Sequence, residues 1–215
     1  SNKDSIVNPI FSAIYNQEFE LAESLLTLQK DELERFYSDV LSIDLFWWKF
    51  STTRSKEDAQ NLNNLLKKHV EQGIERNDKV AQLIGKSYQL RYARKKYNLF
   101  DVISLRSEIN TLLSEIDRNE LPISGNELKL FDLYVTMFNY FSRVNPFSVW
   151  NKSQERDFYV TEMEQFVSEE NLIVKTMAHY FLGRIYQKIE RETEKASAHF
   201  SILTKQFPEN KLFVE

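Results

Sequence analysis

Apolar residues recur every three or four positions along most of the chain, which is the period of an amphipathic α-helix. Near the C-terminus, for example, Ala196, Phe200 and Leu203 fall on one face of a helix, and Pro208 then ends it. No segment shows the strict alternation of apolar and polar residues that indicates a half-buried strand. The pattern therefore predicts an all-α protein of about ten helices, which we expect to pack as about five antiparallel hairpins.

Start and stop signals give these helices approximate bounds. Asn8 and Pro9 have the residue types of an N-cap and a first helical position, and Ser55 with Asp58 resembles a capping box. The third helix is apolar around much of its circumference and should be central, whereas the sixth should bury Ile103 among its apolar residues. The expected helices cover about 8–15, 18–28, 31–48, 55–73, 80–97, 100–117, 128–143, 153–167, 170–187 and 191–206.

Two glycines lie inside predicted helices in the same setting, Ile84-Gly85-Lys86-Ser87-Tyr88 and Leu182-Gly183-Arg184-Ile185-Tyr186. A glycine in mid-helix costs about 1 kcal/mol relative to alanine, so a packing reason is expected for it. Because glycine has no side chain, Gly85 and Gly183 would let a neighbouring helix approach closely. The repeated setting indicates stacked helical pairs.

The stretch from Lys175 to Pro208, which contains Gly183, Ala196 and Phe200, resembles the closing repeat of bacterial tetratricopeptide repeat (TPR)-like proteins. The opening residues around Tyr15, followed by the Leu45-Phe46-Trp47-Trp48-Lys49 helix, resemble a poorly characterised bacterial group of that superfamily. The resemblance implies a right-handed α-α superhelix whose concave face holds a peptide or protein segment, and it implies no reaction. Members of that group are often exported and lack an assigned activity.

The chain also departs from a regular repeat. One extra residue lies between Tyr186 and Ala196, and that turn contains no glycine. The middle of the chain, roughly 100–175, has no clean repeat signature, so we expect a divergent stack there. The cationic clamp by which some members of the superfamily hold a C-terminal carboxylate has no residue-by-residue counterpart in this sequence.

In stacked hairpins the first helix of each pair lines the concave surface. If the two helical glycines face a partner helix, the side chains one position or one turn away look into the groove. These candidate peptide-binding residues are polar, aromatic or cationic, and such a set can bond a peptide backbone and attract carboxylates. They are Gln82, Lys86, Gln89, Tyr180, Arg184 and Gln187.

A chain of 215 residues is long enough for a single repeat domain over 1–215, with a candidate subdomain boundary near 121–126 in the clearest loop. The absence of cysteine excludes disulfides, thiolate metal sites and thiol nucleophiles. No run approaches the ~18 apolar residues of a transmembrane helix. Ser1-Asn2 resembles an expression scar, so we expect that a natural leader was removed; an exported or periplasmic location and a cytoplasmic one both stay open.

Candidate chemistry is sparse. The 3 histidines form no H-E-x-x-H motif, although His179 and His199 could face each other across the last hairpin. A G-x-S-x-G motif and a phosphate loop are absent, and no carboxylate is isolated among apolar residues as a raised pKa would require. We therefore expect no cofactor, no metal and no enzymatic activity. A pocket lined by a desolvated carboxylate would favour an enzyme instead.

A net charge of −4 gives no general attraction to nucleic acid, and the one basic cluster spans Lys86 to Lys96. Its tyrosines Tyr88 and Tyr92 are expected to pack inward while its cations complement the helix dipole, which favours a structural role over nucleic-acid binding. An acidic protein ligand is another interpretation of the same cluster. The adjacent Trp47 and Trp48 point about 100° apart, so we expect one in the core and leave open a groove or dimer contact for the other.

The sequence as a whole therefore predicts a non-enzymatic scaffold that binds a protein or peptide of unknown identity. The alternative is a structural subunit of a homo-oligomer, which the 16 Phe, the 10 Tyr and the tryptophan pair favour. Nucleic-acid binding and an enzymatic role without a known motif are the weaker alternatives.

Overall fold

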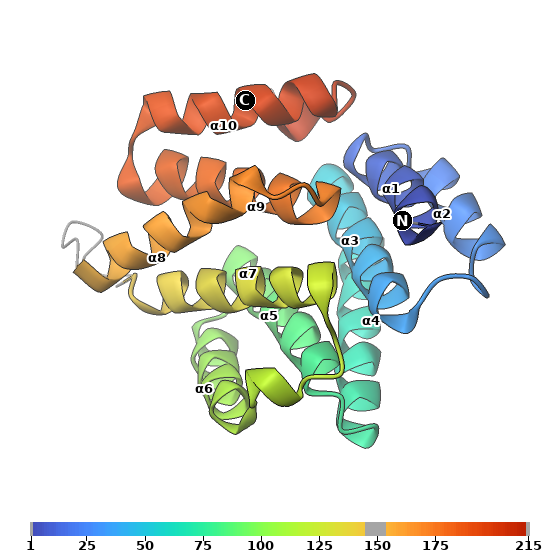
Figure 1. Ribbon diagram of the computed structural model, residues 1–215, viewed down its shortest axis with the longest axis horizontal. Coiled ribbons are helices and arrows are strands. Elements are labelled where there is room, and N and C mark those ends of the chain that lie inside the picture. The colour runs from blue at the N-terminus through green and yellow to red at the C-terminus, as the bar shows by residue number, and fades with distance from the viewer. Residues whose placement is uncertain (1, 145–153, 214–215) are drawn as a thin grey trace. The chain divides into compact units, whose positions relative to one another are not determined.

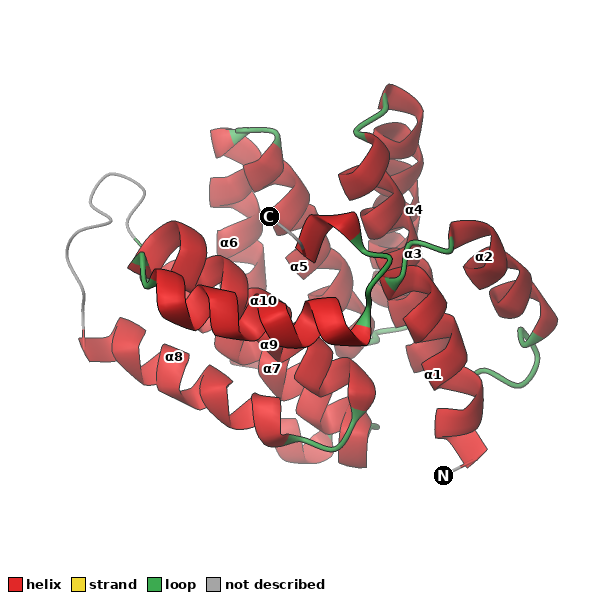
Figure 2. Cartoon of the chain, turned by 90° about the horizontal axis from the view of Figure 1, so that it is seen from above, coloured by secondary structure: helices red, strands yellow, loops and turns green. Residues whose placement is uncertain are grey.

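The computed structural model describes residues 2–144 and 154–213, and every regular element in those two stretches is helical (Figures 1 and 2). The all-α prediction is therefore confirmed. The helices are α1 (Asn2–Tyr15), α2 (Phe19–Leu28), α3 (Arg35–Thr53), α4 (Lys56–Glu75), α5 (Lys79–Lys95), α6 (Leu99–Glu115), η1 (Arg118–Glu120), α7 (Gly125–Ser142), α8 (Gln154–Gln165), η2 (Phe166–Ser168), α9 (Leu172–Ile185), η3 (Tyr186–Glu190), α10 (Thr193–Gln206) and η4 (Lys211–Phe213).

The chain forms two compact units, Ser1–Ile123 and Ser124–Glu215. Unit 1 contains α1 to α6, and unit 2 contains α7 to α10. The boundary between the units falls in the loop that separates η1 from α7.

The helix α3 is the centre of unit 1, because it contacts α1, α2, α4 and α5. Its apolar circumference explains this position, and Trp47 and Trp48 are both buried, with 4% and 1% of their surface exposed. The ring of Trp48 meets Tyr15 of α1 edge to face, and the ring of Trp47 meets Tyr88 of α5 in the same way. Two adjacent tryptophans both fit the core because α3 has neighbours on several sides.

Three turns of unit 1 share one hydrogen-bond pattern. In the first, the N–H of Glu18 donates to the carbonyl of Ala13, and the N–H of Gln17 donates to the carbonyl of Ile14. This is the Schellman motif, in which the residue after the helix takes a left-handed conformation. The same pattern closes α4 at Gly73–Asp78 and α5 at Ala93–Asn98, where Asn77 and Tyr97 have φ values of 53° and 55°. In each motif the carbonyl that accepts the longer-range hydrogen bond belongs to a small residue, Ala13, Gly73 or Ala93. These small residues are a repeated feature that can be read from the sequence.

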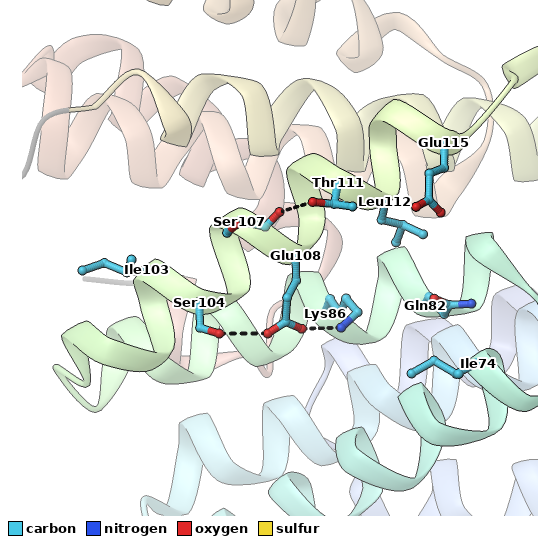
Figure 3. A pocket seen from close by; sticks show the side chains of 10 residues that line it. All are labelled: Ile74, Gln82, Lys86, Ile103, Ser104, Ser107, Glu108, Thr111, Leu112 and Glu115. Atoms are coloured by element: carbon cyan, nitrogen blue, oxygen red, sulfur yellow. Dashed lines mark hydrogen bonds and ion pairs between the residues drawn. The ribbon is translucent and has the colours of Figure 1, made fainter.

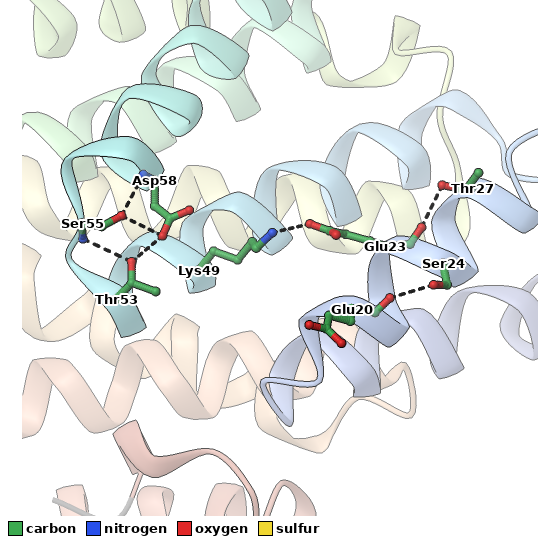
Figure 4. A network of polar contacts seen from close by, with 8 residues as sticks. All are labelled: Glu20, Glu23, Ser24, Thr27, Lys49, Thr53, Ser55 and Asp58. Atoms are coloured by element: carbon green, nitrogen blue, oxygen red, sulfur yellow. Dashed lines mark hydrogen bonds and ion pairs between the residues drawn. The ribbon is translucent and has the colours of Figure 1, made fainter.

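The start of α4 is capped as its sequence predicts. The N–H of Asp58 donates to Ser55 Oγ at 3.0 Å. The Asp58 carboxylate accepts hydrogen bonds from the hydroxyls of Ser55 and Thr53, and these bonds hold its pKa below the ordinary value, with the Thr53 bond as the largest cause (Figure 4). An ion pair between Lys49 and Glu23 joins α3 to α2 in the same region.

Both mid-helix glycines lie against a neighbouring helix, as the sequence predicts. A Cβ added to Gly85 would lie 2.6 Å from Val70 Cγ2 of α4, and a Cβ added to Gly183 would lie 2.9 Å from Phe200 Cζ of α10. Those distances leave no room for a methyl group, so close helix packing explains why glycine occupies both positions.

In unit 2, the extra residue between Tyr186 and Ala196 is absorbed by a π-helical turn, Tyr186–Glu190. Arg191 then adopts a left-handed conformation with a φ of 56°, and the N–H of Glu192 donates to the carbonyl of Tyr186 at 2.9 Å. The wider turn accommodates one more residue while α9 and α10 remain in contact.

A buried ion pair joins this turn to α8. The guanidinium of Arg156 contacts both carboxylate oxygens of Glu190, with Nε 2.9 Å from Oε1 and Nη2 3.3 Å from Oε2, and the two side chains are 1% and 2% exposed. The hydroxyl of Tyr140 from α7 donates to Glu190 Oε1 at 2.8 Å. Burial and this carboxylate raise the pKa of Tyr140 above its ordinary range. Three elements of unit 2 are thus held at one buried carboxylate.

Two expectations about helices were wrong. The first helix begins at Asn2 and continues through Pro9, because Val7, Ile10 and Ile14 form one buried stripe on both sides of the proline. Ile103 is 69% exposed instead of buried, since α6 fully buries only Ile109 and Leu112. The expected cap at residue 153 and the break at 145–146 lie outside the described residues.

Candidate functional site

A groove in unit 1 runs over α5 between α4 and α6. It consists of two adjoining hollows of about 510 Å³ and about 280 Å³, and Ser104 and Glu108 of α6 line both. The first is lined by Ile74, Gln82, Lys86, Ile103, Ser104, Ser107, Glu108, Thr111, Leu112 and Glu115, and the second by Asn63, Gln89, Tyr92, Ala93, Asp101, Ser104, Leu105 and Glu108. Figure 3 shows Ile103 towards one end of the larger hollow and Ile74 with Glu115 towards the other.

The three candidate residues of α5 all line this groove. Gln82 and Lys86 lie in the larger hollow, and Gln89 lies in the smaller one. The side-chain amide of Gln82 donates to the carbonyl of Gly73 at 3.2 Å, which fixes that side chain against the end of α4. The spacing of these three residues places them on one side of α5, and the groove is open on that side.

The ammonium group of Lys86 is already engaged in an ion pair with Glu108. Lys86 Nζ lies 2.5 Å from Glu108 Oε2, and only 12% of the lysine side chain is exposed. Ser104 Oγ donates to the other oxygen of Glu108 at 2.9 Å. The hydrogen bond from Lys86 is the largest cause that lowers the pKa of Glu108. The pair therefore joins the floor of the groove to its wall as two neutralised charges (Figure 3).

The other three candidate residues lie in unit 2. Tyr180 is half-buried in α9, where its ring lies 5.9 Å from that of Phe213. Arg184 is exposed at the end of α9 and donates to Gln187 Oε1 in the π-helical turn at 3.3 Å. The six candidate residues therefore divide between the units, three in each, and in unit 2 a hydrogen bond joins Arg184 to Gln187.

Arg91, Lys95 and Lys96 of the basic cluster lie on another side of α5, over aromatic rings of α3. The guanidinium of Arg91 lies 4.2 Å from the centre of the Trp47 ring, and Lys95 Nζ lies 5.1 Å from the same centre. Tyr88 is fully buried, as predicted, and Tyr92 is half-buried. Cations and aromatic rings pack on one another here, in agreement with the structural interpretation of the cluster.

Sequence reasoning missed two buried carboxylates, Glu190 of the ion pair with Arg156 and Asp44. The statement that no carboxylate is isolated among apolar residues was wrong for Asp44. Asp44 is 0% exposed on α3, and its Oδ1 accepts a hydrogen bond from the hydroxyl of Tyr88. Burial raises the pKa of Asp44 to about 6. Its position among Ile43, Leu45 and the tryptophans was the available signal. Asp44 does not line either hollow of the groove.

His179 and His199 do face each other across the last hairpin, with their Nδ1 atoms 2.9 Å apart. His199 Nε2 lies 3.3 Å from Glu164 Oε1 of α8, and the hydroxyl of Tyr186 donates to the same oxygen at 2.6 Å. Burial is the main cause that lowers the pKa of His179 to about 4, and the neighbouring His199 lowers it further. The Nδ1–Nδ1 contact is a hydrogen bond, in which a single proton lies between the two rings.

The described residues contain no group of three or more His, Cys, Asp or Glu side chains arranged to hold a metal ion. Over the same stretches, none of the helices has the length and apolar character needed to cross a membrane. The sequence matches no protein-family model, and comparisons with curated proteins and with solved structures gave no match. A functional interpretation therefore rests on the site geometry.

Proposed function

We propose that this protein is a non-enzymatic scaffold that binds an extended peptide segment of a partner protein in the groove over α5. The observation that carries this proposal is the position of Gln82, Lys86 and Gln89, which line the two adjoining hollows of the groove. The sequence spacing of the three residues, at i, i+4 and i+7, places them on the side of α5 that faces these hollows.

The length of the groove suits a short peptide. Along α6 the lining residues extend from Asp101 to Glu115, which corresponds to about 21 Å at 1.5 Å per residue. An extended chain advances about 3.3 Å per residue, so about six residues span that distance. A hollow of this length and open shape fits a peptide better than a compact small molecule, which needs an enclosing pocket.

The chemistry of the lining also suits a peptide. Amide side chains from α4 and α5, those of Asn63, Gln82 and Gln89, follow the groove and offer donors and acceptors to a peptide backbone. Ile74 and Ile103 are 56% and 69% exposed, so each offers apolar surface to a ligand side chain. Polar groups would then orient the ligand while the two isoleucines contribute buried area.

A TPR-like stack is part of the same proposal. Three observations support it: consecutive helices pack in pairs, α1 contacts α3 and α3 contacts α5, and glycines lie at the helix contacts. The right-handed superhelix of five hairpins and its role as a scaffold are proposed on this basis.

Two matched variants of the full chain test the groove. Ser107 and Asn110 are both exposed positions of α6, but only Ser107 lines the groove. The wild-type chain is screened against an array of random heptapeptides, and the peptides that bind are measured again with each variant. Ser107→Trp should fill the groove and weaken binding about tenfold or more, whereas Asn110→Trp should leave it unchanged. The proposal is refuted if no peptide binds, or if the two variants behave alike.

A further inference from the structure

The charges around the groove do not match the carboxylate ligand that Lys86 alone would suggest. Its lining contains one cation, Lys86, and three carboxylates, Asp101, Glu108 and Glu115, which gives 1 − 3 = −2. Lys79 lies outside the lining but pairs with Glu115 at 3.4 Å, and counting it leaves −1. The groove is therefore acidic on either count.

An incoming carboxylate would find no available partner at Lys86. The ammonium group is 2.5 Å from Glu108, and its side chain is nearly buried between α5 and α6. To bind a second carboxylate there, Lys86 would have to share its charge, and the new anion would lie beside Glu108. Both effects oppose an acidic ligand.

The three carboxylates of the groove lining are regularly spaced along α6, which forms one wall of the groove. Asp101, Glu108 and Glu115 are seven residues apart on α6, so they lie on nearly the same face at intervals of about 10 Å. Of the three, Asp101 is exposed and accepts a hydrogen bond from the neutral side chain of Asn98 at 2.6 Å, and Glu115 has 55% of its side chain exposed. Asp101 therefore retains negative charge that faces solvent, whereas the exposed carboxylate of Glu115 shares its charge with Lys79.

This spacing matches a common peptide geometry. A polyproline II segment rises about 3.1 Å per residue with three residues per turn, so side chains six positions apart point the same way about 19 Å from each other, which is close to the ~21 Å between Asp101 and Glu115 along α6. Tyr92 lines the smaller hollow near Asp101 and offers an aromatic surface to the stem of a lysine or arginine.

From these charges and spacings we infer that the groove of unit 1 binds a basic, extended segment of a partner protein, with two lysine or arginine residues six positions apart. The inference rests on the proposed function, because it names the partner chemistry of that same groove. The basic side chains of the ligand pair with Asp101 and Glu115, and its apolar residues contact Ile103 and Ile74.

The test uses the full chain and random heptapeptides of equal apolar content that differ in net charge. Basic peptides should bind at least about fivefold tighter than acidic ones at low salt, and the preference should shrink at high salt. Asp101→Asn and Glu115→Gln should each weaken the basic peptides about threefold. Glu71→Gln, at an exposed position of α4 outside the lining, is the matched control and should change nothing.

The possible results separate the two proposals. Preference for acidic or neutral peptides, or equal losses in Glu71→Gln and Asp101→Asn, overturns the basic ligand while the peptide groove stands. Basic peptides that bind equally well to the Ser107→Trp variant place the site elsewhere and overturn both proposals. An array in which no peptide binds overturns both as well.

Discussion

Acid should loosen the last hairpin of unit 2 through a single histidine. His179 is 8% exposed, and its Nδ1 lies 2.9 Å from that of His199, so the contact holds one proton and a second would place two N–H groups against each other. The charged groups around the pair are Glu164 from α8, Lys175 on α9 and Lys195, which lies over the Tyr186 ring. Only Glu164 favours protonation of His179, and burial outweighs it.

The sign and size follow from the two pKa values of His179, which is 6.5 when the chain is unfolded and about 4 in the folded state. Between those pH values the unfolded chain binds more protons, so the stability of unit 2 is complete above pH 6.5 and falls as the pH drops to 4. Each pH unit is worth about 1.4 kcal/mol, which limits the total loss to about 3 kcal/mol. The lowered pKa of Glu164 adds a further loss below pH 4.5.

The assay is native-state hydrogen exchange of peptides from α9 and α10, corrected for intrinsic rates, between pH 7 and pH 4. The wild-type opening free energy should decline across this range. His179→Asn keeps a side-chain N–H that can donate to His199 Nδ1 but does not titrate, so its opening free energy should be flat down to about pH 5. If the wild type and His179→Asn decline with equal slopes, another group is responsible and the reasoning fails.

Two further predictions concern unit 1. Because burial raises the pKa of Asp44 from 3.8 to about 6, its contribution to stability declines as the pH rises through that interval. Asp44→Asn should therefore stabilise unit 1 by about 3 kcal/mol at pH 7 and give no gain below pH 4, as measured by urea unfolding followed by tryptophan fluorescence. An equal gain at both pH values would contradict this reason. Gly85→Ala should lower the melting temperature by an amount corresponding to about 1–3 kcal/mol, despite the better helix propensity of alanine, because the new Cβ meets Val70 and His69 at 2.6 and 2.8 Å. A melting temperature at or above that of the wild type would show that the helix contact adjusts without cost.

The helical period predicted the all-α class and the approximate positions of the helices, because the residues of a buried stripe recur at regular intervals along the sequence. The Ser55 cap and the close contacts at Gly85 and Gly183 followed from local residue types, since those types have few other uses inside or at the start of a helix. Local signals misled at Pro9, where packing on both sides of the ring outweighed the usual preference for a first helical position.

The parts that could not be predicted depend on which helices meet. Ile103 has the residue type of a core position, but α6 presents that side chain to the groove. The neutralisation of Lys86 requires Glu108 to lie opposite it on another helix, and no local pattern contains that pairing. The same holds for Glu164, which reaches His199 from 35 residues away. Sequence spacing therefore predicts which residues share a helix face, but it does not predict the charged partners that other helices bring to them.

Asp44 and His179 give the two halves of this chain opposite responses to mild acid. Protonation neutralises the buried carboxylate of Asp44 in unit 1, whereas it creates a buried positive charge on His179 in unit 2. No single pH then gives both units their highest free energy of unfolding. As a folded sample is acidified from neutral pH, one unit should gain stability while the other loses it.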